Sequence, residues 1–146
     1  MTKKRMKIKG DALQQRSWCM FHANVIVGEC GMERKKTMNL AYMAWDILDG
    51  LGRGIVKFSY YEEDGRYREA RGTLKQGISA AFDAWLGSRH KPRKNNSDGD
   101  LKFIYWDLDE EGWRSFRIER LDKIEEIIIR ETGEFPVAPV NDNQID

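Results

Sequence analysis

Three arginines recur at intervals of three residues in the stretch IYWDLDEEGWRSFRIERL, residues 104–121. They are Arg114, Arg117 and Arg120, and they follow an acidic turn that separates two aromatic runs. A guanidinium presents a rigid fork of N–H donors that matches phosphate oxygens, so these residues suit the binding of an anion. The same arginines also suit ion pairs with neighbouring acidic residues, each worth about 0–1 kcal/mol on a solvated surface. The sequence leaves both interpretations open.

Groups that could catalyse a reaction or hold a metal are scarce. His22 lies in an apolar run and His90 in a polar loop, so neither is placed like a general base. The glycine-rich segment 50–54 lacks the lysine and the helix start of a phosphate-binding loop. Cys19, His22 and Cys30 are one ligand short of a structural zinc site. We therefore expect no enzyme, no cofactor and no metal, and the two cysteines indicate no disulfide framework.

The composition indicates one globular domain with a heavily solvated surface. The chain has 146 residues, of which 40% are apolar and 34% charged, and its mean hydropathy is -0.69. The formal net charge is only +1, so attraction to nucleic acid requires local clusters of positive charge. One cluster is a basic N-terminal arm, residues 1–11, and the other comprises Arg89, Lys91, Arg93 and Lys94. Both clusters also suit ordinary solvated segments.

No segment predicts membrane insertion or secretion. The basic start passes into GDALQQRS without the apolar stretch of about 7–15 residues that a secretory signal needs. The longest apolar run, residues 18–27, is too short to cross a bilayer. We therefore expect a cytoplasmic protein with no membrane partner.

Two helices are predicted to open the domain as a hairpin, residues 12–53. The first covers 12–28 and is apolar almost all round from residue 18 to 27, which indicates burial against other elements. Thr37 is placed to cap the second, and Gly50 and Gly52 end it. The stretch MNLAYMAWDILDG carries two aspartates and no lysine or arginine, unlike a helix that reads DNA.

From Gly54 the apolar pattern alternates, which predicts a β-hairpin. A three-residue loop at 63–65 with Gly65 left-handed places the apolar residues of both strands on one face. The inward residues are then Val56, Phe58 and Tyr60, with Ala70 and Leu74. This register puts Arg68 opposite Tyr60 on the inner face. An arginine there needs a barrel end, a carboxylate or a ligand, because an unpaired buried charge is costly.

Three further strands and a short helix complete the expected fold. The helix covers 77–86, and the strands cover 101–108, 113–118 and 125–131. A basic loop at 87–100 lies between the helix and the next strand, and 133–146 form a flexible tail. We expect an α+β fold in which the helical hairpin packs on a small, closed, five-stranded antiparallel β-barrel spanning 54–132.

Two stretches together resemble a known family. GIVKFSYYEEDGRYREARGTL and DLKFIYWDLDEEGWRSFRIERLDKI resemble the WYL domain, a Sm-like, SH3-type β-barrel, and more closely a second WYL-like group described from phages and Bacteroidales. The matching residues are Phe58 to Tyr60, Arg68, Trp113, Arg114, Phe116, Arg117 and Leu121. The strand that gives the parent family its name reads Ile-Tyr-Trp-Asp-Leu here.

The resemblance implies a regulatory module with an SH3-like barrel that binds a nucleotide or nucleic acid through clustered arginines. The resemblance carries over Arg68, Arg114, Arg117 and Arg120 as anion contacts. Nearby Trp113 and Tyr105 complete the expected ligand-binding residues, and the basic cluster of Lys91, Arg93 and Lys94 is expected to add auxiliary nucleic-acid contacts. Trp113 or Tyr105 would stack a base. The alternative is a phage-encoded adaptor or virion-associated factor in a bacterial host, which meets a protein partner and binds no small ligand. The sequence does not fix the oligomeric state.

Overall fold

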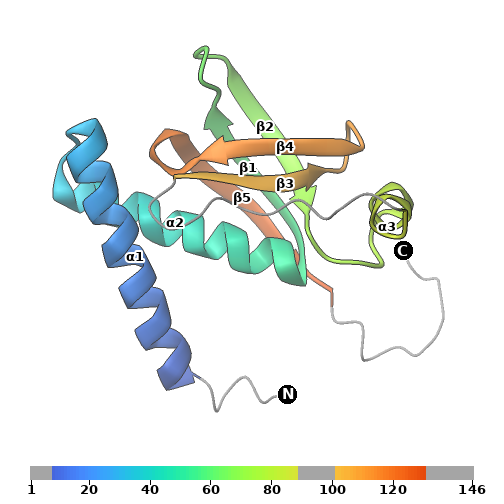
Figure 1. The fold of residues 1–146 in the computed structure, drawn as a ribbon, viewed down its shortest axis with the longest axis horizontal. Helices are drawn as coiled ribbons and strands as arrows, with labels where there is room; N and C mark the ends of the chain where they lie inside the picture. Colours follow the sequence, from blue (N-terminus) through green and yellow to red (C-terminus); the bar gives the residue numbers. More distant parts are fainter. Residues whose placement is uncertain (1–7, 89–100, 131–146) are drawn as a thin grey trace.

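The computed structural model describes residues 8–88 and 101–130. Its elements are α1 (Ile8–Cys30), α2 (Arg34–Arg53), β1 (Gly54–Tyr61), β2 (Tyr67–Thr73), α3 (Ala80–Leu86), β3 (Lys102–Asp107), β4 (Gly112–Arg117), the short 3-10 helix η1 (Ile118–Arg120) and β5 (Leu121–Ile129) (Figure 1). The tail, the auxiliary residues Lys91, Arg93 and Lys94, and the start of the basic arm lie outside these ranges. The first helix begins at Ile8, four residues before its predicted start.

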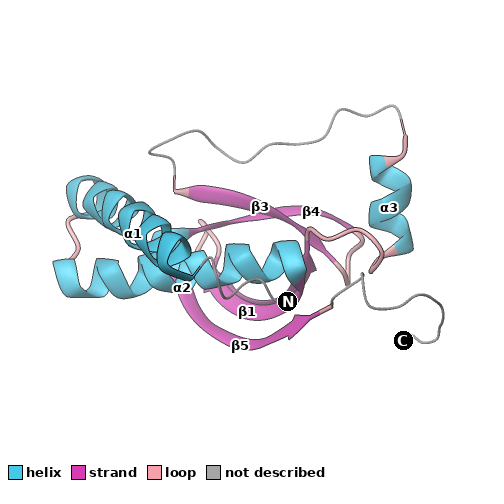
Figure 2. Ribbon diagram, turned by 90° about the horizontal axis from the view of Figure 1, so that it is seen from below, coloured by secondary structure: helices cyan, strands magenta, loops and turns pink. Residues whose placement is uncertain are grey.

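The five strands form one antiparallel sheet in the order β4-β3-β2-β1-β5. The sheet curls so that β3 and β4 face β1 and β5 (Figure 2). Among the described strands no pairing joins β4 to β5, so the predicted five-stranded fold is confirmed but the barrel stays open. Within the described residues, the strand ladder that joins the two hairpins has two residue pairs, Gly72 with Asp107 and Thr73 with Trp106. The Leu108 N–H donates to the Arg71 carbonyl beside this ladder at 2.9 Å. From that junction they diverge.

The register predicted for the first hairpin is confirmed. Tyr60 pairs with Arg68 and Tyr61 with Tyr67. The Glu62 N–H then donates to the Arg66 carbonyl at 2.8 Å, which closes a three-residue loop. Gly65 in that loop has a φ of 93°, a left-handed conformation that glycine adopts without strain.

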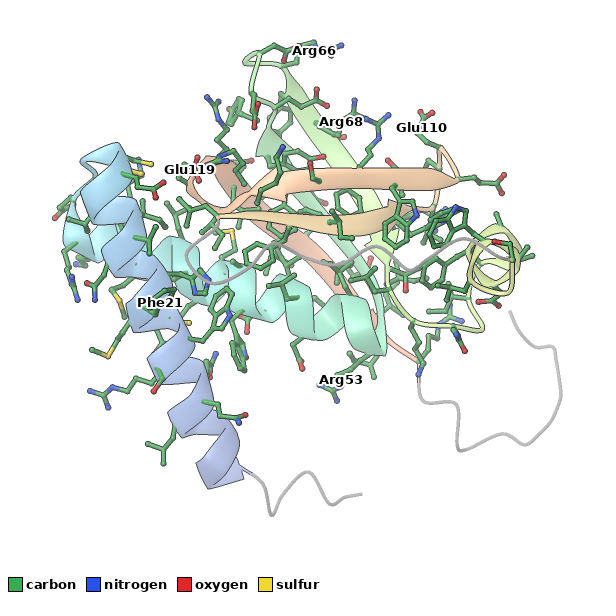
Figure 3. All side chains as sticks on the ribbon, in the orientation of Figure 1. Phe21, Arg53, Arg66, Arg68, Glu110 and Glu119 are labelled. Atoms are coloured by element: carbon green, nitrogen blue, oxygen red, sulfur yellow. The ribbon has the colours of Figure 1, made fainter. Side chains whose placement is uncertain are left out.

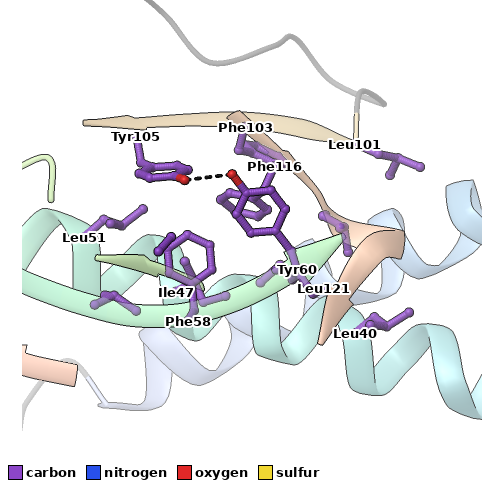
Figure 4. Packing of buried hydrophobic residues seen from close by; sticks show 14 of the residues in the cluster. Leu40, Ile47, Leu51, Phe58, Tyr60, Leu101, Phe103, Tyr105, Phe116 and Leu121 are labelled. Atoms are coloured by element: carbon purple, nitrogen blue, oxygen red, sulfur yellow. Dashed lines mark hydrogen bonds between the residues drawn. The ribbon is translucent and has the colours of Figure 1, made fainter. Parts of the chain in front are cut away.

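One face of α2 fills the opening of the curved sheet. Its buried residues include Leu40, Ala44, Ile47 and Leu51, which recur at helical spacing. They pack in one cluster with the inward side chains of the strands, among them Val56, Phe58, Tyr60, Phe103, Tyr105 and Phe116 (Figure 4). Each large apolar side chain buried in this way contributes about 1.5–3 kcal/mol to stability. The helical hairpin and the sheet therefore share a core.

The first helix packs less completely than its sequence predicts. Cys19, Ala23 and Ile26 are fully buried, and the Trp18 ring lies 5.7 Å from that of Trp45 on α2. Met20 and Phe21 are 40% and 45% exposed, which contradicts the expectation of burial all round.

The second helix differs from expectation at both ends. Gly50 and Gly52, which the sequence predicts to end it, lie inside the helix, which continues past both of them. Gly50 is buried there, where a Cβ would lie 2.7 Å from the Val56 side chain. The second helix starts at Arg34, so Thr37 lies inside it and donates its hydroxyl to the Arg34 carbonyl instead of capping it.

Cys19 is buried and Cys30 exposed, and both thiols are free. Within 8–88 and 101–130, no helix has the length and hydropathy that crossing a bilayer demands.

Close packing of backbone at the start of β1 yields a first prediction. A Cβ at Gly54 would overlap the carbonyl oxygen of Ile128 and lie 3.0 Å from the amide nitrogen of Arg130. We expect Gly54→Ala to lower the free energy of unfolding by about 2–3 kcal/mol, because β1 and β5 must separate. Gly52→Ala is the control, since a Cβ there meets nothing within 4 Å and should stabilise α2 by about 0.5–1 kcal/mol. Urea unfolding measures both, and an unchanged Gly54→Ala variant would contradict this packing.

Candidate anion-binding site

A pocket of about 330 Å³ lies where the β1–β2 hairpin and β4 diverge. Its lining residues come from the end of β1 and the hairpin loop (Tyr60, Tyr61, Glu62, Glu63), the start of β3 (Lys102), β4 (Trp113, Arg114, Ser115, Phe116, Arg117) and η1 (Arg120). The lining includes four basic and two acidic side chains, a formal charge of +2. The lining side chains are therefore net positive, and Asp107 and Glu119, which pair with two of the arginines from outside the lining, offset part of this charge.

The structure brings most of the predicted ligand-binding residues together. Arg114, Arg117, Arg120 and Trp113 all line the pocket. Arg68 is not in the lining itself but is bonded to Glu62, which is. Figure 3 shows Arg68 on the hairpin beside β4, whereas Arg66 lies at the hairpin tip.

A buried carboxylate holds Arg114. The Nε of Arg114 donates to Oδ2 of Asp107 at 2.9 Å, and Asp107 is only 3% exposed. The other carboxylate oxygen accepts hydrogen bonds from the N–H groups of Asp109 and Glu110, at 2.9 and 3.1 Å. One side chain therefore fixes both the turn before β4 and the arginine that follows it. Hydrogen bonds to an ionised acceptor are stronger than neutral ones, which makes this arrangement firm.

Glu62 ties the hairpin to two arginines of the predicted set. Its Oε2 accepts a hydrogen bond from Arg68 Nε, and its backbone carbonyl accepts one from Arg120 Nη1 at 3.1 Å. The hydrogen bond to Glu62 raises the pKa of Arg68, so the guanidinium stays charged. Of the three environments that an inward Arg68 could have, the structure shows the second, a pair with a carboxylate.

Arg117 is held by the residue two positions later in the chain. Its Nε donates to Oε2 of Glu119 at 2.6 Å, and this hydrogen bond raises the pKa of Arg117. η1 places both residues, since the strand ends at Arg117 and the 3-10 turn follows at once.

The ion pairs of these arginines use only part of their hydrogen-bonding capacity. In the described part of the chain, the hydrogen bonds from Arg68, Arg114 and Arg117 all come from Nε, so their Nη groups remain for a ligand. Their side chains are 25%, 31% and 29% exposed, which leaves them reachable from solvent. Local ion pairs therefore orient the arginines without using all their donors.

The two aromatic candidates have different environments. Tyr105 is fully buried, and its hydroxyl hydrogen-bonds that of Tyr60 at 2.7 Å (Figure 4). Burial raises the pKa of both tyrosines, so both hydroxyls stay protonated. No base can stack on a ring without an exposed face, which removes Tyr105 from that role. Trp113 lines the pocket but also packs on Trp106 and on Trp85 of α3, each at 5.4 Å between ring centroids.

Three aromatic residues that line the pocket, Tyr60, Tyr61 and Phe116, were not among the predicted ligand contacts. Tyr60 and Phe116 are buried and Tyr61 is 46% exposed, so Tyr61 is the one of the three that a ligand can reach. The sequence did contain an indication of this, because Tyr61 is the last outward residue of the first strand and lies next to the hairpin loop. The described ranges contain no cluster of three or more His, Cys, Asp or Glu side chains able to hold a metal ion. His22 bonds the Trp18 carbonyl through Nδ1 at 2.9 Å and stacks on that ring.

Asp107 provides a direct test of this geometry. We expect Asp107→Asn to lower the free energy of unfolding by about 2–3 kcal/mol, because it leaves the Arg114 charge without its buried partner. Asp109→Asn is the matched control. That carboxylate pairs with Arg71 at 3.1 Å but is 62% exposed, so its loss should cost about 0–1 kcal/mol. Equal effects of the two substitutions in urea unfolding would show that Asp107 does not organise the turn.

Comparison with known proteins places this site within a family. The family model WYL_2, described as a Sm-like SH3 beta-barrel fold, matches residues 45–122, over half of the chain. No curated protein and no solved structure gives a match. The matched span runs from the second half of α2 to the start of β5 and contains every residue that lines the pocket. It also contains the strands on which the resemblance was recognised, and WYL domains are generally binding or regulatory domains. The chain belongs to the WYL_2 family.

Proposed function

We propose that this protein is a non-catalytic binding module whose basic pocket takes a phosphate-bearing ligand, either single-stranded nucleic acid or a nucleotide. One observation carries the proposal. Three arginines from β4 and η1 line a single pocket, and carboxylates hold two of them through Nε with the Nη groups left over. The family supports a binding or regulatory role in general.

Phosphate suits this pocket better than other anions for geometric reasons. The two Nη groups of an arginine can donate in parallel to two oxygens of one phosphate. Arg114 and Arg117 on β4 give two such forks, which fits successive phosphates of a strand. The volume of about 330 Å³ is at the lower end of small-ligand pockets, so it suits about one nucleotide at a time.

Preorganisation supports the same assignment. A free arginine side chain loses about 0.5–1.5 kcal/mol of conformational freedom when a ligand orders it. Arg114 and Arg117 are already ordered by Asp107 and Glu119, so a ligand has less of this cost to meet. The two carboxylates also limit non-specific attraction, because they offset part of the positive charge.

A protein-binding role is the second candidate, and the exposed face of α1 favours it. Leu13, Met20 and Phe21 are 63%, 40% and 45% exposed, and they recur at helical spacing on a surface away from the core. Such a stripe is typical of a helix that meets another protein. An adaptor of this kind would ignore oligonucleotides.

Binding of a labelled single strand, followed by fluorescence anisotropy, tests the proposal. We expect Arg117→Ala to weaken binding by about 10-fold or more, because one charge-assisted contact contributes about 1.5–3 kcal/mol. Arg114→Lys keeps the charge beside Asp107 and should weaken binding through loss of the fork alone. Arg66→Ala is the control, since Arg66 is 72% exposed and lies outside the pocket lining. If Arg66→Ala weakened binding as much as Arg117→Ala does, the attraction would be spread over the surface, and this result would contradict a specific site in the pocket.

Salt dependence separates the pocket from the basic loop. The logarithm of affinity should fall with the logarithm of salt concentration, with a slope of about 0.7 per phosphate neutralised. Neutralising Lys91, Arg93 and Lys94 should mainly reduce this slope, because each positive charge that contacts a phosphate releases counterions. Absence of binding at low salt would favour the protein-binding role. A slope that stays unchanged in this triple variant would exclude the loop from the contact.

A further inference from the structure

Two exposed tyrosines face each other across the first hairpin at the edge of the pocket. Tyr61 and Tyr67 are a cross-strand pair, and each is 46% exposed. Their ring centroids lie 5.1 Å apart, with an angle of 54° between the ring planes. Large aromatic rings are usually buried, so an exposed pair on a rigid hairpin indicates either local packing or a binding surface.

The pair is joined to the pocket through Tyr61. This residue is part of the lining, together with Arg117, Arg120 and Lys102. The next residue, Glu62, accepts the hydrogen bond from Arg120 through its backbone carbonyl. Tyr61 and Arg120 therefore line the same pocket, and Arg120 is bonded to the residue that follows Tyr61 in the chain.

Hydrogen bonds to Asp122 on β5 also hold the tyrosine pair in place. The Tyr67 hydroxyl donates to Oδ2 of Asp122 at 2.9 Å, and the Ser59 hydroxyl donates to the same oxygen at 2.9 Å. Tyr67 thus has a fixed position on β2, and Tyr61 lies against its ring. A tyrosine ordered before binding provides contact area at little cost in conformational freedom.

We propose that Tyr61, backed by Tyr67, is a stacking surface for a base of a single-stranded nucleic acid whose phosphates contact Arg114 and Arg117. The inference rests on the proposed function, and it adds that the site recognises a base as well as a phosphate. Every base has an aromatic face, so stacking tolerates many sequences. It takes over the role that sequence analysis gave to Tyr105, whose ring is buried.

The competing explanation is that the two rings only stabilise the hairpin. Cross-strand aromatic pairs do this in many sheets, and their removal lowers stability without any effect on a ligand. A test must therefore separate the base from the phosphate backbone, and binding from folding.

The experiment compares two labelled strands of about 12 nucleotides, one with bases and one abasic, at equal length and charge. Tyr61→Leu should lose about 10-fold in affinity for the strand with bases and less than about 2-fold for the abasic strand, because only stacking is removed. Tyr61→Trp should restore binding to the strand with bases. Tyr42→Leu is the matched control, since Tyr42 is 37% exposed on α2 and outside the pocket lining, and it should change neither affinity.

Each outcome decides between the explanations. If Tyr61→Leu binds both strands as the wild type does, or weakens both equally, stacking on Tyr61 is excluded while the phosphate site stands. If the wild type binds neither strand, the proposed function fails and the stacking surface fails with it. Should Tyr61→Leu unfold, the tryptophan variant still decides, because weaker binding of the strand with bases by a folded Tyr61→Trp protein would overturn the proposal.

Discussion

The buried carboxylate of Asp107 is the interaction on which the geometry of the pocket depends. It accepts hydrogen bonds from the two N–H groups of the β3–β4 turn and from Arg114. The same residue pairs with Gly72, in the strand ladder that joins the two hairpins. A Cβ at Gly72 would lie 2.5 Å from the Tyr105 ring, so glycine permits that close approach. The junction therefore sets where β4 diverges from the first hairpin, and the pocket lies between the two where they diverge.

The ion pairs around the pocket orient the arginine side chains more than they stabilise the fold. The partly exposed pairs of Arg68 with Glu62 and of Arg117 with Glu119 contribute about 0–1 kcal/mol each, which is too little to explain the six charged side chains that line one opening. Their effect on orientation is larger, because Nε is fixed and the Nη groups are left available. Glu62 extends this order to the hairpin, since its side chain holds Arg68 and its carbonyl holds Arg120.

The sequence predicted the parts of the fold that short-range chemistry controls. Gly65 and the alternating pattern gave the hairpin register, and helical spacing gave the buried face of α2. It could not predict that Tyr105 is buried. Every residue from Phe103 to Asp107 is buried, because α3 covers one side of β3 and the core covers the other, and alternation carries no information in such a strand. The opening of the barrel also depends on long-range pairing, which a local pattern does not contain. The start of β5 at Leu121, four residues before its predicted start, follows from pairing with Tyr60.

The central claim is that oriented arginines in this pocket bind phosphate. The most direct measurement is an NMR titration that follows the arginine Nε–H signals as a single-stranded oligonucleotide is added. The account predicts that the signals of Arg114 and Arg117 move together and saturate, because their Nη groups take up the phosphate while Nε stays on its carboxylate. The Arg66 signal, from the hairpin tip, should stay in place. Movement confined to residues outside the pocket, or no movement at all, would contradict the account.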